Sequence, residues 1–173
     1  RRSSDLVPVW IREAKERFPK LKIKVLNKES QFSQSIDPCL WVASYTQLRR
    51  HRHLLDDHPF RYAILDEAQL IKNPKAKVTQ ACLSIQAKHR MALSGTPIEN
   101  TALDLWTIFR FLMPGLLGGR KEFENDLLSD PDGTALLLRK QVTPFVLRRI
   151  KSEVAKELPP KIENEIGCVL NEE

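Results

Sequence analysis

The sequence predicts an α/β fold in which helices flank a parallel β-sheet, and three apolar segments carry that prediction. Residues 39–43 (CLWVA), 62–65 (YAIL) and 91–93 (MAL) are short apolar runs without polar alternation. Such runs are typical of strands buried on both faces, as in a parallel sheet covered by helices. Each run leads into polar residues and then into a segment with helical spacing, which predicts strands joined by helical crossovers.

The N-terminal part of the chain is expected to contain a helix and one further strand. Ser4 or Asp5 can cap a helix in which Pro8 lies in the first turn and residues 9–18 follow with helical spacing. Residues 21–26 (LKIKVL) alternate between apolar and charged side chains, as a strand does. We therefore expect this helix to precede the first strand.

Helical segments are also expected after the apolar runs. Ser44 opens one of them, and Pro74 lies near the first turn of a second helix over residues 74–87. Residues 101–119 form a third helix that ends near Pro114, and Trp106 lies on its apolar face as a core residue. Two shorter helices are expected near residues 120–128 and 132–141.

Two adjacent acids, Asp66 and Glu67, follow the central apolar run at its carboxyl end. In open α/β sheets this edge is where ligands bind. One carboxylate there can hold a hydrated Mg²⁺ on a nucleotide phosphate, and the other can orient or deprotonate the attacking water. The alternative is that the two acids simply begin a polar loop.

Composition excludes several classes of protein. Of 173 residues, 42% are hydrophobic and 29% charged, which is ordinary for a globular protein. The sequence contains no apolar run as long as a membrane span. The formal net charge is +6, which favours a polyanionic partner. Cys39, Cys82 and Cys168 lie far apart without CxxC spacing, so they indicate buried thiols in a reducing compartment and no zinc site.

The segment LDEAQLIKNP, residues 65–74, resembles the Walker B motif of superfamily-two helicases and translocases, specifically the Swi/Snf-like ATPases of bacterial type. Three further segments resemble motifs of this family and occur in the family's order. They are SYTQL (44–48), LSGTPIEN (93–100) and FVLRRIKSEV (145–154). The resemblance spans nearly the whole chain, although the phosphate-binding pattern GxxxxGK[ST] does not occur in it.

The resemblance implies a partial RecA-like (P-loop NTPase) lobe with a helical insertion. Residues 1–100 would form the core of the first lobe without the Walker A loop, and residues 101–142 would form a helical protrusion. Residues 143–173 would complete the lobe and lead toward a second lobe. The chain is thus expected to be a piece of a larger protein and to be inactive alone.

The resemblance also assigns roles to individual residues. Asp66 would hold Mg²⁺ together with ATP, and Glu67 would activate water. The residues that would couple hydrolysis to DNA are Gln69, Ser94, Gly95 and Thr96, and Gln69 would pair with the SGTP segment across the strand edges. The residues that would contact DNA are Ser44, Tyr45, Asn100, Arg148, Arg149 and Lys151.

Some of these residues have a second interpretation from the sequence itself. Ser44 can be a simple helix N-cap. Gly95 permits an unusual backbone angle or a close approach. Arg148, Arg149 and Lys151 would crowd the start of a helix, where the macrodipole disfavours cations. They would then need either a phosphate or acids such as Glu153 as partners.

The implied function is an ATP-dependent translocase on double-stranded DNA that moves or displaces bound proteins, with RNA polymerase as one expected partner. The expected location is the bacterial cytoplasm, near the nucleoid. Two alternatives stay open: an RNA helicase lobe of the same superfamily, and a non-catalytic nucleic-acid-binding scaffold with this fold.

Overall fold

The computed structural model describes residues 6–30, 32, 37–55, 58–96 and 101–149. The chain divides into two compact units, Arg1–Gln141 and Val142–Glu173. Of the elements that the structure describes, the first unit contains the strands and most of the helices. Of the second unit, the structure describes residues 142–149.

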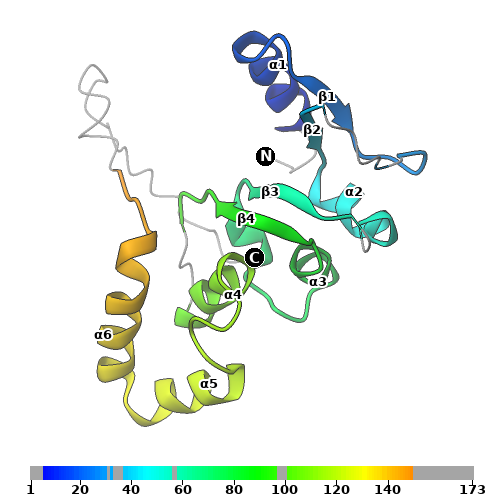
Figure 1. Ribbon diagram of the computed structural model, residues 1–173. Coiled ribbons are helices and arrows are strands. Elements are labelled where there is room, and N and C mark those ends of the chain that lie inside the picture. Colours follow the sequence, from blue (N-terminus) through cyan, green and yellow to red (C-terminus); the bar gives the residue numbers. More distant parts are fainter. Residues whose placement is uncertain (1–5, 31, 33–36, 56–57, 97–100, 150–173) are drawn as a thin grey trace, which may run out of the picture. The chain divides into compact units, whose positions relative to one another are not determined.

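The described strands form two parallel pairs, which confirms the predicted fold class. Strand β1 (Lys22–Val25) pairs with β2 (Cys39–Val42), and β3 (Phe60–Leu65) pairs with β4 (Ala87–Ala92). In the second pair, Ile64 lies opposite Met91 and Leu65 opposite Ala92. Figure 1 shows β3 and β4 side by side, with α3 (Lys77–Leu83) and α4 (Ala102–Leu112) beneath them.

The prediction that the central strands are buried on both faces is wrong for β3 and β4. Ala63 and Leu65 are buried, whereas Tyr62 and Ile64 on the opposite face are 59% and 53% exposed. Met91, which lies opposite Ile64, is 52% exposed. An apolar run alone does not reveal whether both faces are covered, because side chains alternate between faces whatever their polarity. β3 and β4 also begin earlier than the runs that predicted them.

The core lies on the covered face of β3. Its residues come from β3, from the residue after β1, and from the helices and turns around them: Leu26, Leu48, Leu55, Ala63, Leu65, Ala68, Ile71, Ala81, Cys82, Ile85, Ile108 and Phe111. Burying apolar surface of this kind stabilises the fold by about 25 cal/mol per Å². This cluster therefore supports the loop that follows β3.

Arg90, in β4, contacts α4 and the turn between α3 and β4. Its guanidinium donates hydrogen bonds to the carbonyl of Phe111, at the end of α4, and to the carbonyl of Ile85, each at 2.8 Å. It also lies 5.2 Å from the Phe111 ring centroid. Burial lowers the pKa of Arg90, but arginine keeps its charge at neutral pH. Arg90 thus fixes the end of α4 against β4.

Helix α1 (Val7–Arg17) confirms the predicted N-terminal helix but not its cap. The N-cap is Leu6, and no side chain caps the helix there. Pro8 lies in the first turn as predicted, where its missing N–H costs nothing. Ser4 and Asp5 lie outside the described residues.

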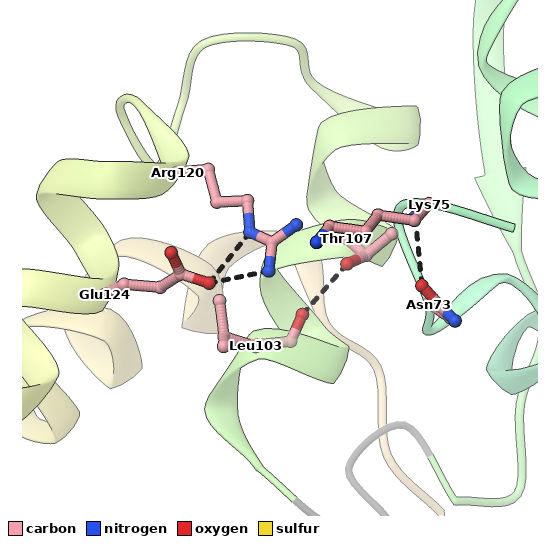
Figure 2. A network of polar contacts seen from close by, with 6 residues as sticks. All are labelled: Asn73, Lys75, Leu103, Thr107, Arg120 and Glu124. Carbon is pink, nitrogen blue, oxygen red and sulfur yellow. Dashed lines mark hydrogen bonds and ion pairs between the residues drawn. The ribbon is translucent and has the colours of Figure 1, made fainter.

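Helix α3 is shorter than the predicted helix over residues 74–87. It begins at Lys77, because Asn73 forms a turn with Lys75 and Ala76 ahead of it. The Asn73 side chain accepts a hydrogen bond from the Lys75 N–H at 2.9 Å (Figure 2). Asparagine favours such local turns over helix. Pro74 therefore lies in the turn and not in the helix.

Within residues 101–149, the structure describes three α-helices. Helix α4 begins after Thr101, α5 spans Arg120–Ser129, and α6 spans Pro131–Val142, close to the three predicted segments. Ile108 and Phe111 of α4 belong to the core. Trp106 is 4% exposed, which confirms its prediction as a core residue.

Polar contacts within these helices are shown in Figure 2. Arg120 and Glu124 form an ion pair at 2.7 Å within α5, and the Thr107 hydroxyl donates to the Leu103 carbonyl within α4. The predicted helical protrusion over residues 101–142 includes α4, whose residues Ile108 and Phe111 belong to the core. The division at residues 100 and 142 stays a prediction.

In the second unit, Thr143–Phe145 form a short 3₁₀ turn, and residues 146–149 are irregular. Arg148 and Arg149 are exposed, and neither forms an ion pair within the described residues. Lys151, Glu153 and Cys168 lie outside the described residues.

Candidate functional site

The candidate site lies where β3 and β4 end, at the same edge of their parallel pair. Backbone hydrogen bonds extend beyond the strands: Leu93 N–H donates to the Leu65 carbonyl and Ala68 N–H to the Leu93 carbonyl, both at 2.8 Å. This pairing brings Asp66 and Glu67, after β3, close to Ser94, after β4. The parallel register thus assembles the predicted acids and the predicted SGTP segment at one edge.

Asp66 is held by three hydrogen bonds from different parts of the chain. Its Oδ2 accepts from the indole Nε1 of Trp10 at 2.9 Å, and its Oδ1 accepts from the backbone N–H of Glu67 at 2.9 Å. Its backbone carbonyl accepts from the Tyr45 hydroxyl at 2.7 Å. The carboxylate therefore has a defined orientation, while its remaining lone pairs stay available to a ligand.

Glu67 has a left-handed backbone, with φ 51° and ψ 51°. It has a positive φ, unlike every other non-glycine residue in the part of the chain that the structure describes. Its side chain is exposed, and its Oε2 accepts a hydrogen bond from the Gln69 amide at 2.7 Å. Strained backbone of this kind is concentrated at functional sites.

Gln69 links Glu67 to the segment after β4. While its Nε2 donates to Glu67, its Oε1 accepts from the Ser94 hydroxyl at 2.7 Å. Ser94 Oγ in turn accepts from the Thr96 N–H at 3.2 Å. The prediction that Gln69 pairs with the SGTP segment across the strand edges is confirmed.

Gly95 does not have the steric role predicted for it. Its φ is not positive, and a Cβ added there would meet nothing within 4 Å. A side chain would therefore fit at this position in the structure. The role of Gly95 in coupling hydrolysis to DNA stays a prediction, and the local geometry gives no reason why this position needs glycine.

Ser44 and Tyr45 begin α2 (Tyr45–Arg50), and both are engaged within the chain. Ser44 is buried and forms a capping box with Gln47, which confirms its interpretation as a helix N-cap. Tyr45 is largely buried, and burial raises the pKa of its hydroxyl. The DNA contacts predicted for Ser44 and Tyr45 stay predictions, as do those of Asn100 and Lys151, which lie outside the described residues.

The oxygen ligands at this edge fit Mg²⁺ bound through a nucleotide. Asp66 offers a hard, partly exposed carboxylate, the ligand type that Mg²⁺ prefers. Within the described residues, no group of three His, Cys, Asp or Glu side chains is placed to hold a metal ion. A Mg²⁺ ion at Asp66 would thus need phosphate oxygens and water for its remaining ligands.

Trp10 is the residue at this site that sequence reasoning missed. It precedes Asp66 by 56 positions, so no local spacing connects the two. Its exposed fraction of 39% is high for a tryptophan on a helix that packs against a sheet. No pattern in the sequence indicated that Trp10 contacts Asp66.

Known proteins resemble this chain at high coverage. The chain is 36% identical over 167 residues to an uncharacterized ATP-dependent helicase of Mycoplasma pneumoniae, covering 94% of this chain and 16% of that protein. It is 36% identical over 187 residues to the TATA-binding protein-associated factor MOT1 of Saccharomyces cerevisiae, covering 94% of this chain and 10% of that protein. The chain thus spans a small part of these relatives' length.

Solved structures agree with these relatives. The SWI2/SNF2 ATPase core of Sulfolobus solfataricus in complex with double-stranded DNA matches with a TM-score of 0.75 and 34% identity. The match covers 87% of this chain and 33% of that one. The predicted RecA-like fold is thereby confirmed. A family model described as the SNF2-related domain matches residues 4–173. The chain belongs to the family of SNF2-related domains.

Proposed function

We propose that this chain is part of the ATPase of a double-stranded DNA translocase that moves or displaces DNA-bound proteins. The observation that carries the proposal is the hydrogen-bonded series Glu67–Gln69–Ser94 at the carboxyl edge of β3 and β4. It joins the acid assigned to water activation to the segment assigned to DNA coupling. The family relationship and the DNA-bound relative of known structure support it.

In this proposal, the chain's own residues orient the reactants. Asp66, held by two N–H donors, would hold Mg²⁺ through its carboxylate. When bound, Mg²⁺ neutralises charge on the phosphates of ATP. Glu67 accepts a hydrogen bond from the attacking water and can take its proton. Gln69 holds the Glu67 carboxylate and responds to movement of Ser94.

The relatives suggest what such a motor acts on. MOT1 is named as a TATA-binding protein-associated factor, and the solved relative is bound to double-stranded DNA. By extension, we propose double-stranded DNA as the track and a DNA-bound protein as the object that is moved. If RNA and not DNA proved to be the track, the function would instead be that of an RNA helicase.

Two substitutions in the whole protein that contains this chain test the proposal. Glu67→Gln keeps the size of the side chain, so ATP affinity should stay within a few-fold while turnover falls about 10²- to 10⁴-fold. Asp66→Ala should weaken binding of Mg-ATP itself. Glu29→Gln makes the same chemical change at an exposed acid outside the site and should leave both quantities unchanged.

The polymer that stimulates hydrolysis separates the functional classes. Duplex DNA should stimulate ATPase activity of the unmodified protein, and RNA should not. Turnover of Glu67→Gln within a few-fold of the unmodified protein would show that Glu67 is not the water-activating residue. Stimulation by RNA alone would replace the translocase by an RNA helicase.

A further inference from the structure

The indole of Trp10 reaches Asp66 from a helix that is otherwise remote from the candidate site. Trp10 lies in α1, which contacts β1 and β2, whereas Asp66 follows β3. The indole Nε1 donates to Asp66 Oδ2 at 2.9 Å. This hydrogen bond therefore connects the first helix with the acid assigned to Mg²⁺.

Burial does not account for the position of Trp10. Its side chain is 39% exposed, whereas Trp106, which serves the core, is 4% exposed. A tryptophan that serves only packing would be expected to bury nearly all of its large apolar surface, as Trp106 does. The feature that distinguishes Trp10 is its indole N–H, which donates a hydrogen bond to Asp66.

The three donors to Asp66 act on different parts of the residue. The Tyr45 hydroxyl fixes the backbone carbonyl, and the Glu67 N–H fixes one carboxylate oxygen. Without Trp10, the other oxygen would have no donor, and the carboxylate could rotate about the bond to its Cβ. The Trp10 N–H thus sets the plane of the carboxylate.

We propose that Trp10 is a positioning residue that orients the Asp66 carboxylate toward Mg²⁺. The inference rests on the proposed function, in which Asp66 holds the Mg²⁺ of Mg-ATP. Hydrogen-bond partners of metal ligands fix the ligand's orientation, and their loss commonly costs 10- to 100-fold in metal affinity or activity. Trp10 would act in this way from α1, through its hydrogen bond to Asp66.

The test uses the whole protein and two substitutions at position 10. Trp10→Phe keeps an aromatic ring but removes the donor. Trp10→His restores a donor, because the Nε2 of imidazole occupies the same place in its five-membered ring as the indole Nε1. Trp41→Phe is the matched control, since it removes an indole N–H from β2 that makes no hydrogen bond to Asp66.

The quantity to measure is the Mg²⁺ concentration that gives half-maximal binding of a non-hydrolysable ATP analogue at pH 8. Trp10→Phe should raise it about 10-fold. Nucleotide affinity without Mg²⁺ and the thermal midpoint should stay unchanged. Trp10→His should restore most of the Mg²⁺ dependence, and Trp41→Phe should match the unmodified protein. A purely structural role would instead move the metal-free affinity and the midpoint.

A second measurement requires no substitution at Trp10. In protein with ¹⁵N-labelled tryptophan, the Trp10 indole N–H resonance should shift on Asp66→Ala, whereas the Trp41 resonance should not. The inference would be overturned if Trp10→Phe left the Mg²⁺ dependence of nucleotide binding unchanged. It would also be overturned if the Trp10 indole N–H resonance did not shift on Asp66→Ala. Asp66→Ala separates this failure from failure of the proposed function: if it leaves Mg²⁺ dependence intact, the metal assignment itself is wrong.

Discussion

The Ser94 hydroxyl donates a hydrogen bond to the Gln69 amide oxygen at 2.7 Å, across 25 positions of sequence. At the same time, the side-chain amide of Gln69 donates a hydrogen bond to the Glu67 carboxylate. Because one amide group serves both contacts, a displacement of Ser94 must change the environment of the Glu67 carboxylate. The pair is therefore a physical connection between the ends of two neighbouring strands.

This connection predicts that Gln69 and Ser94 act as a unit. Gln69→Ala and Ser94→Ala should each lower DNA-stimulated turnover of the whole protein about 2- to 10-fold, since a hydrogen bond contributes about 0.5–1.5 kcal/mol. The double variant should be no worse than the worse single variant. Ser84→Ala removes a comparable hydroxyl that donates to the Ala81 carbonyl and makes no contact in the Glu67–Gln69–Ser94 series, so it should have no effect. Strictly additive losses would contradict the connection.

Arg148 and Arg149 are predicted to contact phosphates of DNA. Replacing both by alanine should raise the DNA concentration that half-maximally stimulates ATPase activity. It should also make the salt dependence of DNA binding shallower, because each lost phosphate contact removes about one unit of slope. Arg49 and Arg50 are exposed on α2 and provide the matched pair, whose replacement should change neither quantity. Equal effects of both pairs would indicate a general charge effect.

The 173-residue chain alone is predicted to bind Mg-ATP weakly and to hydrolyse none above background. Its sequence has no GxxxxGK[ST] loop, and Asp66 can supply only part of the ligands that Mg²⁺ needs. Calorimetry of the purified chain with Mg-ATP checks this. A micromolar dissociation constant would mean that the nucleotide site is elsewhere.

Stability should fall at alkaline pH because of Cys82. Burial raises the pKa of its thiol from 9.0 to about 12, so the folded chain keeps a proton that the unfolded chain loses above pH 9. Between these values, the free energy of unfolding should decrease by about 1.4 kcal/mol per pH unit from this group. Tyr45 contributes in the same direction above pH 10, since burial raises its pKa too.

Two substitutions isolate the thiol's contribution to this slope. Cys82→Ala and Cys82→Val both remove the titrating group, although one leaves a cavity and the other adds volume. Denaturant unfolding between pH 9 and 11 should give both variants a shallower slope than the unmodified protein, whatever their stability at pH 7. A slope that stays unchanged in both would show that Cys82 does not remain protonated.

The sequence was sufficient for the elements that rest on local pattern. Asp66 and Glu67 follow a strand, Ser44 caps a helix, and Trp106 lies in the core, all as local spacing indicates. The Gln69–Ser94 contact was predicted from family resemblance, because no local pattern joins residues on different strands.

Features that depend on tertiary structure were not predictable in this way. The exposure of Tyr62 and Ile64 depends on what covers the second face of the sheet, which a run of apolar residues does not report. The contact of Trp10 with Asp66 depends on where α1 packs. The late start of α3 was visible in principle, since asparagine before proline favours a turn.

The left-handed backbone of Glu67 has a consequence for laboratory evolution. A side chain in this conformation costs roughly 1 kcal/mol or more, whereas glycine adopts it freely. Variants selected only for resistance to heat should therefore accumulate glycine at position 67, because the exposed carboxylate contributes little packing. Selection for ATP turnover should restore the acid, so the two screens would favour opposite residues at the same position.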